Sequence, residues 1–282
     1  MSAIVRPAQE GDIGAVIDLL HRHMNAKIPP ERWRRLLDYP WRPDGVERGW
    51  LVEDHGRIVG FMGTIYSDRR IGGQVRRFCD LSSWYLLADY RGDGTGDELL
   101  RSGMAQPGVT YQTMTARRAT GRRIRALGFS ILDDSRSLFR PGSPGAGRLS
   151  VLREASAIRA RLDAAQRAVF DAHAGFDLHQ AIVGDTWIVW QRKLKGDSIA
   201  YHEILHASDP AFLSAEAQTI ADVLVTGERG VLAIDTRFMT PGDDPGTIEA
   251  IVLPRWFRSP HVAARDVDHL HSEIILLDQK LP

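Results

Sequence analysis

The glycine-rich segment 90–100 constrains the fold of this 282-residue chain more than any other feature. It follows a strand-like run, places Gly92, Gly94 and Gly96 within five positions, and opens an apolar helix. Glycine lets the backbone turn tightly and approach a ligand without a Cβ in the way. The unpaired N–H groups in the first turn of the following helix then point at an anion. The segment therefore predicts a loop that binds a phosphate group.

The spacing within this loop separates the known kinds of phosphate loop. The nucleoside-triphosphate pattern Gly-x-x-x-x-Gly-Lys-Ser/Thr and the dinucleotide pattern Gly-x-Gly-x-x-Gly are both missing. The sequence has Arg91-x-x-Gly94-x-Gly96 instead. This spacing resembles the Arg/Gln-x-x-Gly-x-Gly/Ala pyrophosphate loop of the GCN5-related N-acetyltransferases (GNAT), which use acyl-coenzyme A. A glycine-rich surface turn would give the same short pattern, so the surroundings must decide.

The segments around the loop follow the order of the GNAT fold over residues 1 to about 135. Hydrophobic periodicity predicts a strand at 3–6, a helix at 13–24, a hairpin of 50–53 and 58–66, and a strand at 77–87 that runs into the loop. A helix at 97–105, a strand at 109–114 and a helix at 116–127 follow. The pair Gly128-Phe129 resembles the one that ends the corresponding helix in this family. The resemblance implies an α/β (α+β) GNAT-like acyl-CoA N-acyltransferase fold with a central mixed, mostly antiparallel sheet.

The chain is too long for one such domain. We expect a GNAT-like domain at 1–140, a linker and bridging helix at 141–175, and a C-terminal α/β domain at 176–282. The break falls in the proline- and glycine-rich run 141–147, and one helical stripe continues from Leu149 to Val169. Further on we predict strands at 187–192, 199–206, 231–238 and 273–277, with a helix after Asp209 that runs to about residue 226. This order of elements resembles a degenerate, tandem GNAT-like repeat. The resemblance rests on the order of elements alone.

Composition narrows the function classes. Lys plus Arg equals Asp plus Glu at 36 each, so no net charge draws the chain to nucleic acid or to an anionic membrane. The single cysteine, Cys79, excludes an intramolecular disulfide framework and is expected to be a small buried hydrophobe. No apolar run reaches the roughly 18 residues that span a bilayer, and no export signal precedes the first helix. We expect a soluble, cytoplasmic protein, whose oligomeric state the sequence leaves open.

A zinc-peptidase pattern, His202-Glu203-x-x-His206, offers a competing function. Its chemistry needs a helix, where residues four apart share a face and both imidazoles reach one metal. The run 198–206 is short and rich in β-branched and aromatic residues, which predicts a strand. His202, Ile204 and His206 would then share one face and Glu203 the other. The candidates for a third ligand, Glu216 and Glu228, are typical helix-surface acids, so we expect no metal.

A second polar group near the C-terminus, Asp266, Asp268, His269 and His271, could also be imagined around a metal. These residues occupy a predicted connection, where such side chains are normally solvated. We therefore expect no metal site there either.

The family resemblance implies where the ligand binds and how it reacts. Coenzyme A or acetyl-coenzyme A would enter between the fourth and fifth strands as co-substrate, and an amine of a small molecule or peptide would attack the thioester directly. Main-chain groups of Tyr85, Leu86 and Leu87 would pair with the pantetheine arm, and one of their amides would stabilise the oxyanion. Arg91 stands at the mouth of the loop. The pyrophosphate would be held by the backbone of Gly92, Asp93, Gly94, Thr95, Gly96 and Asp97. The arginines of 117–125 would either contact the 3′-phosphate or form a solvated basic face.

The general base and acid are where the sequence departs from the family pattern. Relatives often carry a glutamate on the fourth strand, and by register that position is Ser83, with Asp80 the nearest carboxylate. The tyrosine that relatives often use as the acid is replaced by Ile124. Tyr85 is our candidate substitute, with Tyr90 and Tyr111 as alternatives. The departures keep open a second function, a module that binds acyl-coenzyme A without turning it over. The aromatic residues Trp33, Tyr39 and Trp41 either line the acceptor groove or belong to the core.

Overall fold

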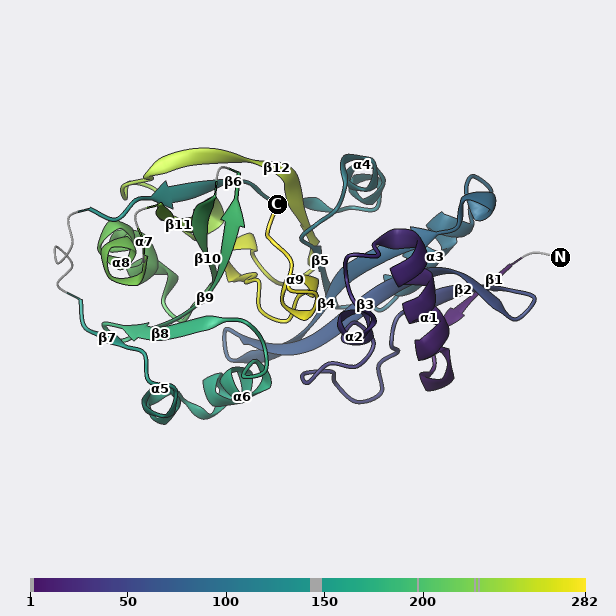
Figure 1. Cartoon of the computed structure of the whole chain (residues 1–282), viewed down its shortest axis with the longest axis horizontal. Coiled ribbons are helices and arrows are strands. Elements are labelled where there is room, and N and C mark those ends of the chain that lie inside the picture. Colours follow the sequence, from purple (N-terminus) through teal and green to yellow (C-terminus); the bar gives the residue numbers. More distant parts are fainter. Residues whose placement is uncertain (1–2, 143–148, 197, 226, 228) are drawn as a thin grey trace. The chain divides into compact units, whose positions relative to one another are not determined.

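The computed structural model describes residues 3–142, 149–196, 198–225, 227 and 229–282 (Figure 1). The chain forms two compact units. The first comprises Met1–Thr115, Phe257–Val262 and His271–Gln279; the second comprises Ala116–Trp256, Ala263–Leu270 and Lys280–Pro282. Most of the expected interdomain break, 143–148, lies outside the described residues. The expected domain limits of 140 and 175 stay a prediction.

The first unit contains the elements predicted around the glycine loop. They are β1 (Ile4–Pro7), α1 (Ile13–Leu19), α2 (Pro30–Arg34), β2 (Trp50–Asp54), β3 (Arg57–Ile71), β4 (Gln74–Leu86), α3 (Thr95–Gly103), β5 (Thr110–Thr113) and α9 (Glu273–Leu276). The strands lie in the order β1-β2-β3-β4-β5, and only β4 and β5 are parallel. α1 buries Ile13, Val16 and Leu19, which recur at helical spacing, and a π-helical turn continues it to Met24. The predicted mixed, mostly antiparallel sheet is confirmed.

The second unit is built around a sheet in the order β12-β6-β11-β10-β9-β8-β7. Its elements are α4 (Arg118–Ala126), β6 (Ser130–Phe139), β7 (Val151–Leu152), α5 (Ala155–Arg161), α6 (Ala164–Ala172), β8 (His179–Val183), β9 (Thr186–Lys195), β10 (Ile199–Ala207), α7 (Pro210–Ala215), α8 (Ala217–Leu224), β11 (Gly230–Asp235) and β12 (Thr247–Arg258). The last two residues of β12 belong to the first unit. The predicted strand after Gly128-Phe129 is β6, which pairs with β11.

The second unit repeats the topology of the first. Its strands β7 to β10 are joined in antiparallel pairs, and β10 is parallel to β11 as β4 is to β5. The helices also fall at matching places: α5 and α6 connect β7 to β8, and α7 and α8 connect β10 to β11. A right-handed crossover helix is what a parallel pair needs. The strand pairing is consistent with the expected tandem repeat, which stays a prediction.

The core of the second unit lies between its sheet and the helices α7 and α8. Ile188, Trp190 and Ile204 from the strands pack in one buried cluster with Leu213 and Ile220 from the helices. α7 begins where the sequence indicates, because the Asp209 carboxylate accepts hydrogen bonds from the first-turn amides and Pro210 occupies the first helical position.

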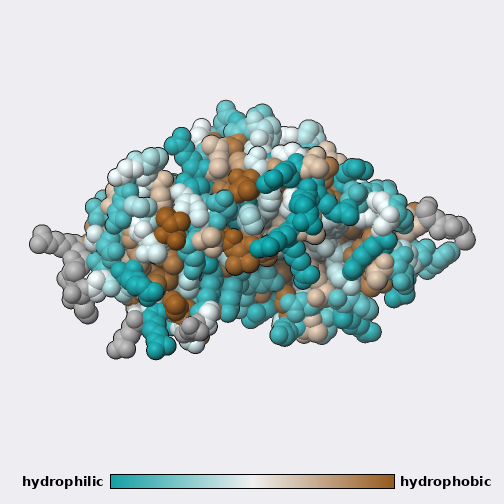
Figure 2. Space-filling view, turned by 90° about the horizontal axis from the view of Figure 1, so that it is seen from above, coloured by the Kyte–Doolittle hydropathy of each residue, from teal (hydrophilic) through white to brown (hydrophobic). Residues whose placement is uncertain are grey.

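The face shown in Figure 2 is largely hydrophilic, with apolar residues in separate groups.

Two expectations about the second half of the chain are wrong, and one strand was not predicted. The stripe 149–169 is two helices, α5 and α6, because Leu162 is extended and Asp163 caps a new helix. The segment from Glu273 is the helix α9 and not a strand. Its apolar residues Ile274 to Leu277 are all buried, so they carry no alternation that would distinguish strand from helix. The sequence analysis also missed β12, whose pattern is interrupted by Pro254 and by Val252, which is 72% exposed.

Candidate functional site

A β-bulge near the end of β4 marks the candidate site in the first unit. Phe61 of β3 faces Tyr85, but Gly63 faces Ser82, so Ser83 and Trp84 together oppose one residue of β3. Ser83 takes a left-handed backbone conformation with φ of +54°. Non-glycine residues adopt this conformation at an energetic cost, and bulges are common beside functional sites. The bulge lies at Ser83, the position where the family resemblance implies the base.

The strands β4 and β5 diverge just before this bulge. Their parallel ladder joins Phe78 to Thr110 and ends at Asp80 and Gln112. Among the described residues no strand pairs with 81–86 on the β5 side. The edge of a strand presents N–H and C=O groups that can pair with another chain, so this stretch of β4 is suited to pair with the main chain of a ligand.

Two glycines of the loop that follows β4 have a left-handed backbone conformation and open space around them. Gly92 and Gly94 have φ of +100° and +98°, and a Cβ added to either would meet nothing within 4 Å. Gly94 is the N-cap of α3, and no side chain caps this helix end. The amides of Gly92, Gly94 and Gly96 have no protein partner among the described residues. The arrangement of these amides at a helix N-terminus is one that suits an anion.

Other predicted donors of the loop are engaged inside the protein. Thr95 N–H donates to the Asp93 carboxylate at 2.9 Å, which lowers the pKa of Asp93. Asp97 N–H donates to Gly94 O at 3.0 Å. A phosphate at the helix end would therefore meet the free glycine amides first and would compete with Asp93 for the amide of Thr95.

The predicted pantetheine-binding residues lie directly before the loop. Leu86 O accepts a hydrogen bond from Arg91 Nε at 2.7 Å, and the Arg91 guanidinium carbon lies 5.4 Å from the Tyr85 ring centroid. Leu87 N–H donates to Val59 O at 2.9 Å, which leaves it engaged within the sheet. The half-buried Tyr85 and the arginine thus shape one wall beside the loop mouth.

Asp80, the expected nearest carboxylate, is buried against a second carboxylate from a distant part of the chain. Its Oδ2 accepts a hydrogen bond from the backbone N–H of Glu273 at 2.7 Å. The Glu273 carboxylate accepts hydrogen bonds from the hydroxyls of Ser82 and Thr115. Burial raises the pKa of Asp80 well above its ordinary value, and the charge of Glu273 adds to this effect. Burial also raises the pKa of Glu273.

Sequence reasoning missed Glu273 as a functional candidate because it assigned this residue to a terminal strand. The only available signal was the placement of a glutamate directly before four apolar residues, Ile274 to Leu277. A charged residue in such a run is either at an end or buried with partners.

The remaining candidate side chains are placed as follows. Tyr90 OH donates to Asp54 at 2.7 Å and ties the loop to the β2–β3 hairpin. Tyr111 is 1% exposed, and Trp33 and Tyr39 are buried core residues. Cys79 is fully buried, which confirms the sequence prediction and raises the pKa of its thiol.

The zinc-peptidase geometry is not formed. His202 and His206 lie on β10, as predicted, but a register shift between Ile204 and His206 places His206 opposite Val189 and leaves His202 opposite Arg192. The expectation that the two histidines share a face is wrong, because a bulge reverses the alternation. Burial lowers the pKa of His202 to about 4. Glu203 is paired with Lys195 and Gln191, and Glu228 lies outside the described residues.

The C-terminal polar connection is not solvated throughout, contrary to expectation. His269 is fully buried and its Nε2 lies 2.5 Å from Asp235 Oδ2. Burial lowers the pKa of His269 to about 4. His206 Nδ1 lies 2.9 Å from Asp268 Oδ2. Across the described part of the chain, histidine, cysteine and acidic residues form no group of three that could hold a metal ion.

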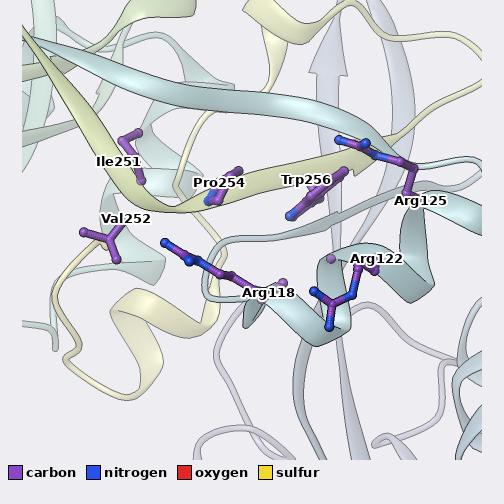
Figure 3. A pocket seen from close by; sticks show the side chains of 9 residues that line it. Arg118, Arg122, Arg125, Ile251, Val252, Pro254 and Trp256 are labelled. Carbon is purple, nitrogen blue, oxygen red and sulfur yellow. The ribbon is translucent and has the colours of Figure 1, made fainter.

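The arginines expected near a 3′-phosphate line a pocket of about 400 Å³ in the second unit (Figure 3). Arg118, Arg122 and Arg125 come from α4, and the opposite wall is β12 with Trp256. The Arg125 guanidinium lies 5.2 Å from the Trp256 ring, and Gly121 lets α4 approach this ring so closely that a Cβ would lie 2.9 Å from it. The pocket therefore combines positive charge with an aromatic and aliphatic wall.

Comparison with solved structures defines the class of fold. A GCN5-related N-acetyltransferase from Kribbella flavida superposes with a TM-score of 0.59 over 92% of this chain and 72% of that one, at 13% identity. One from Anabaena variabilis ATCC 29413 gives 0.57 over 91% and 72%, at 13% identity. Eis1 from Mycobacterium abscessus gives 0.53 over 92% and 73%, at 14% identity. The fold is that of the GNAT acyltransferases.

A family model matches part of the sequence directly. Residues 15–106 match the model of the Acetyltransferase (GNAT) family, and this segment includes β4, the bulge and the glycine loop. No curated protein matches the sequence significantly. No helix among the described residues is long and apolar enough to cross a membrane.

Proposed function

We propose that this chain transfers an acyl group, in the first instance acetyl, from coenzyme A to an amine of a small molecule or peptide. The observation that carries the proposal is the combination of a stretch of β4 beyond the end of its ladder with β5 and the open glycine loop that follows it. These features suit the two polar parts of one long ligand, an amide-containing arm and a diphosphate.

In this proposal the β4 backbone around Tyr85 and Leu86 aligns the arm, and the amides of Gly92, Gly94 and Gly96 hold the diphosphate. Binding both partners in one complex supplies the orientation that the reaction needs. The amine nitrogen attacks the thioester carbonyl, an N–C bond forms, and the C–S bond breaks with its electron pair on sulfur. A main-chain amide beside the bulge stabilises the carbonyl oxygen as it becomes negative. We assign Asp80, Ser83 and Tyr85 to the catalytic region on this basis.

The proposal is tested by incubating the protein with acetyl-coenzyme A and a panel of amines while free thiol is measured. We expect thiol release that requires both the protein and an amine, with a mass increase of the amine equal to one acetyl group. Calorimetry with coenzyme A runs in parallel. Binding without thiol release across a broad panel would contradict catalysis and favour a module that only binds acyl-coenzyme A. No affinity for coenzyme A would contradict both functions.

A further inference from the structure

The acceptor amine must lose a proton before it can attack, because alkyl amines are mostly protonated at neutral pH. No carboxylate occupies the position on β4 where the family resemblance expects the base, since Ser83 stands there. The structure nevertheless holds a carboxylate connected to that position through hydroxyl groups. Ser83 Oγ lies 3.0 Å from Ser82 Oγ, and Ser82 Oγ donates to Glu273 Oε2.

The direction of these hydrogen bonds follows from the number of hydrogens available. Each serine hydroxyl has one hydrogen to donate. When Glu273 is ionised, Ser82 gives its hydrogen to the carboxylate, and the hydrogen between the two serines then comes from Ser83. Ser83 Oγ then keeps its lone pairs as acceptors for an incoming N–H. Ser83 is also the most exposed member at 8%, against 3% for Ser82 and 2% for Glu273.

The bulge makes this arrangement possible. Successive residues of a regular strand point to opposite faces, so neighbouring serines would not meet. The left-handed conformation of Ser83, with φ of +54°, turns its hydroxyl toward that of Ser82. The unfavourable backbone conformation of Ser83 thus makes the contact with Ser82 possible. Strained residues of this kind are common at functional sites.

We propose that Ser83, Ser82 and Glu273 form a proton relay that deprotonates the acceptor amine, an inference that rests on the proposed function. The acceptor ammonium gives one proton to Ser83 Oγ, Ser83 passes its own proton to Ser82, and Ser82 passes its proton to the Glu273 carboxylate. Glu273 becomes a carboxylic acid and later releases the proton to solvent. After attack, a second nitrogen-bound proton neutralises the departing thiolate, and the third stays on the amide.

The residues around Glu273 suit the acceptance of a proton by its carboxylate. Thr115 holds its other carboxylate oxygen, and Asp80 holds its backbone N–H, so the side chain has a fixed position. Among the described residues, the charged groups that shift the pKa of Asp80 are Glu273 on α9, which raises it, and Arg69 on β3, which lowers it. The buried thiol of Cys79 on β4 also interacts with the charge of Asp80. Burial raises the pKa of Glu273, which brings proton uptake closer to neutral pH. In the relay Ser83 is the catalytic residue, while Ser82 and Glu273 are positioning residues that act through it.

The test compares the pH profiles of kcat/KM for the wild type, Glu273→Gln, Ser82→Ala and Ser83→Gly. Glycine at 83 removes the hydroxyl while it accepts the left-handed backbone. We expect each variant to lose about 100-fold in kcat/KM near neutral pH, the size typical of lost general-base catalysis. The deficit should shrink as pH rises and the free amine accumulates, while coenzyme A affinity changes less than twofold. Ser137→Ala is the matched control, because Ser137 is a fully buried serine of the second unit whose hydroxyl has no partner.

The outcomes separate the relay from the proposed function. A wild type that releases no thiol with any amine overturns the proposed function and the relay with it. A wild type that turns over, with variants whose profiles keep their shape and position, overturns the relay alone. An equal loss at every pH would also overturn it, because that pattern is expected of a merely structural role. Circular dichroism and melting curves of the variants show that any loss occurs in folded protein.

Discussion

At the scale of the residue, the burial of Asp80 beside Glu273 makes stability depend on pH. Burial raises the pKa of Asp80 in the folded chain well above its unfolded value, so the folded state binds protons more tightly. Stability is then fully present below the unfolded pKa, about 4, and falls as pH rises toward the folded pKa. Glu273 and Arg69 are the charges that act on Asp80. We predict that Asp80→Asn, which keeps an acceptor for Glu273 N–H, flattens the fall in melting temperature between pH 5 and 8. The exposed Asp44→Asn serves as control. Parallel curves for wild type and Asp80→Asn would contradict the assignment.

At the scale of the element, the glycine loop and the start of α3 form one binding unit in the proposed function. Gly94 combines a φ of +98° with the N-cap position, and an alanine there forces the backbone away from this conformation. We predict that Gly94→Ala weakens coenzyme A binding about tenfold, or about 1.4 kcal/mol, measured by calorimetry. Gly108→Ala is the matched control, since Gly108 has a φ of +76° and equally open surroundings but lies after α3. It should lose stability without losing affinity. Equal affinity losses in both variants would show that backbone strain, and not the loop, weakens binding.

At the scale of the whole molecule, the first unit is completed by segments far along the chain. His271–Gln279 supplies α9, which contacts β4 and places Glu273 beside Asp80. Ser259, at the end of β12, lies 2.7 Å from Thr110 of β5 through their hydroxyls. We predict that truncation after residue 270 lowers the melting temperature strongly, because each buried apolar side chain of 274–277 is worth about 1.5–3 kcal/mol. Calorimetry of the truncated and full chains, with a dye that binds exposed apolar surface, measures the effect. An unchanged melting temperature would mean that α9 is dispensable for the unit.

The sequence was sufficient to predict those features that depend on residues close together in the chain. The glycine loop, the helix cap at Asp209 and the strands β2, β3 and β4 follow local rules of conformation and alternation, and the structure confirms them. The prediction of a strand from His202 to His206 is also confirmed, because the β-branched and aromatic composition of this segment is local information. The shared face of the two histidines was wrong, because a bulge is set by pairing with β9 and not by the segment itself.

The proposed catalytic region could be predicted from the sequence only in part. Asp80 could be named from its distance to the loop, and Ser83 from the family register, but nothing near either residue points to Glu273. The two carboxyl residues are 193 positions apart, and α9 reads as strand or helix from its uniformly apolar run. The sequence alone therefore determined the glycine loop, the order of elements around it and the GNAT resemblance, since each rests on short-range pattern. Only the tertiary structure decided which carboxylate meets the serines of the bulge, because that contact depends on the C-terminal segment folding back onto β4.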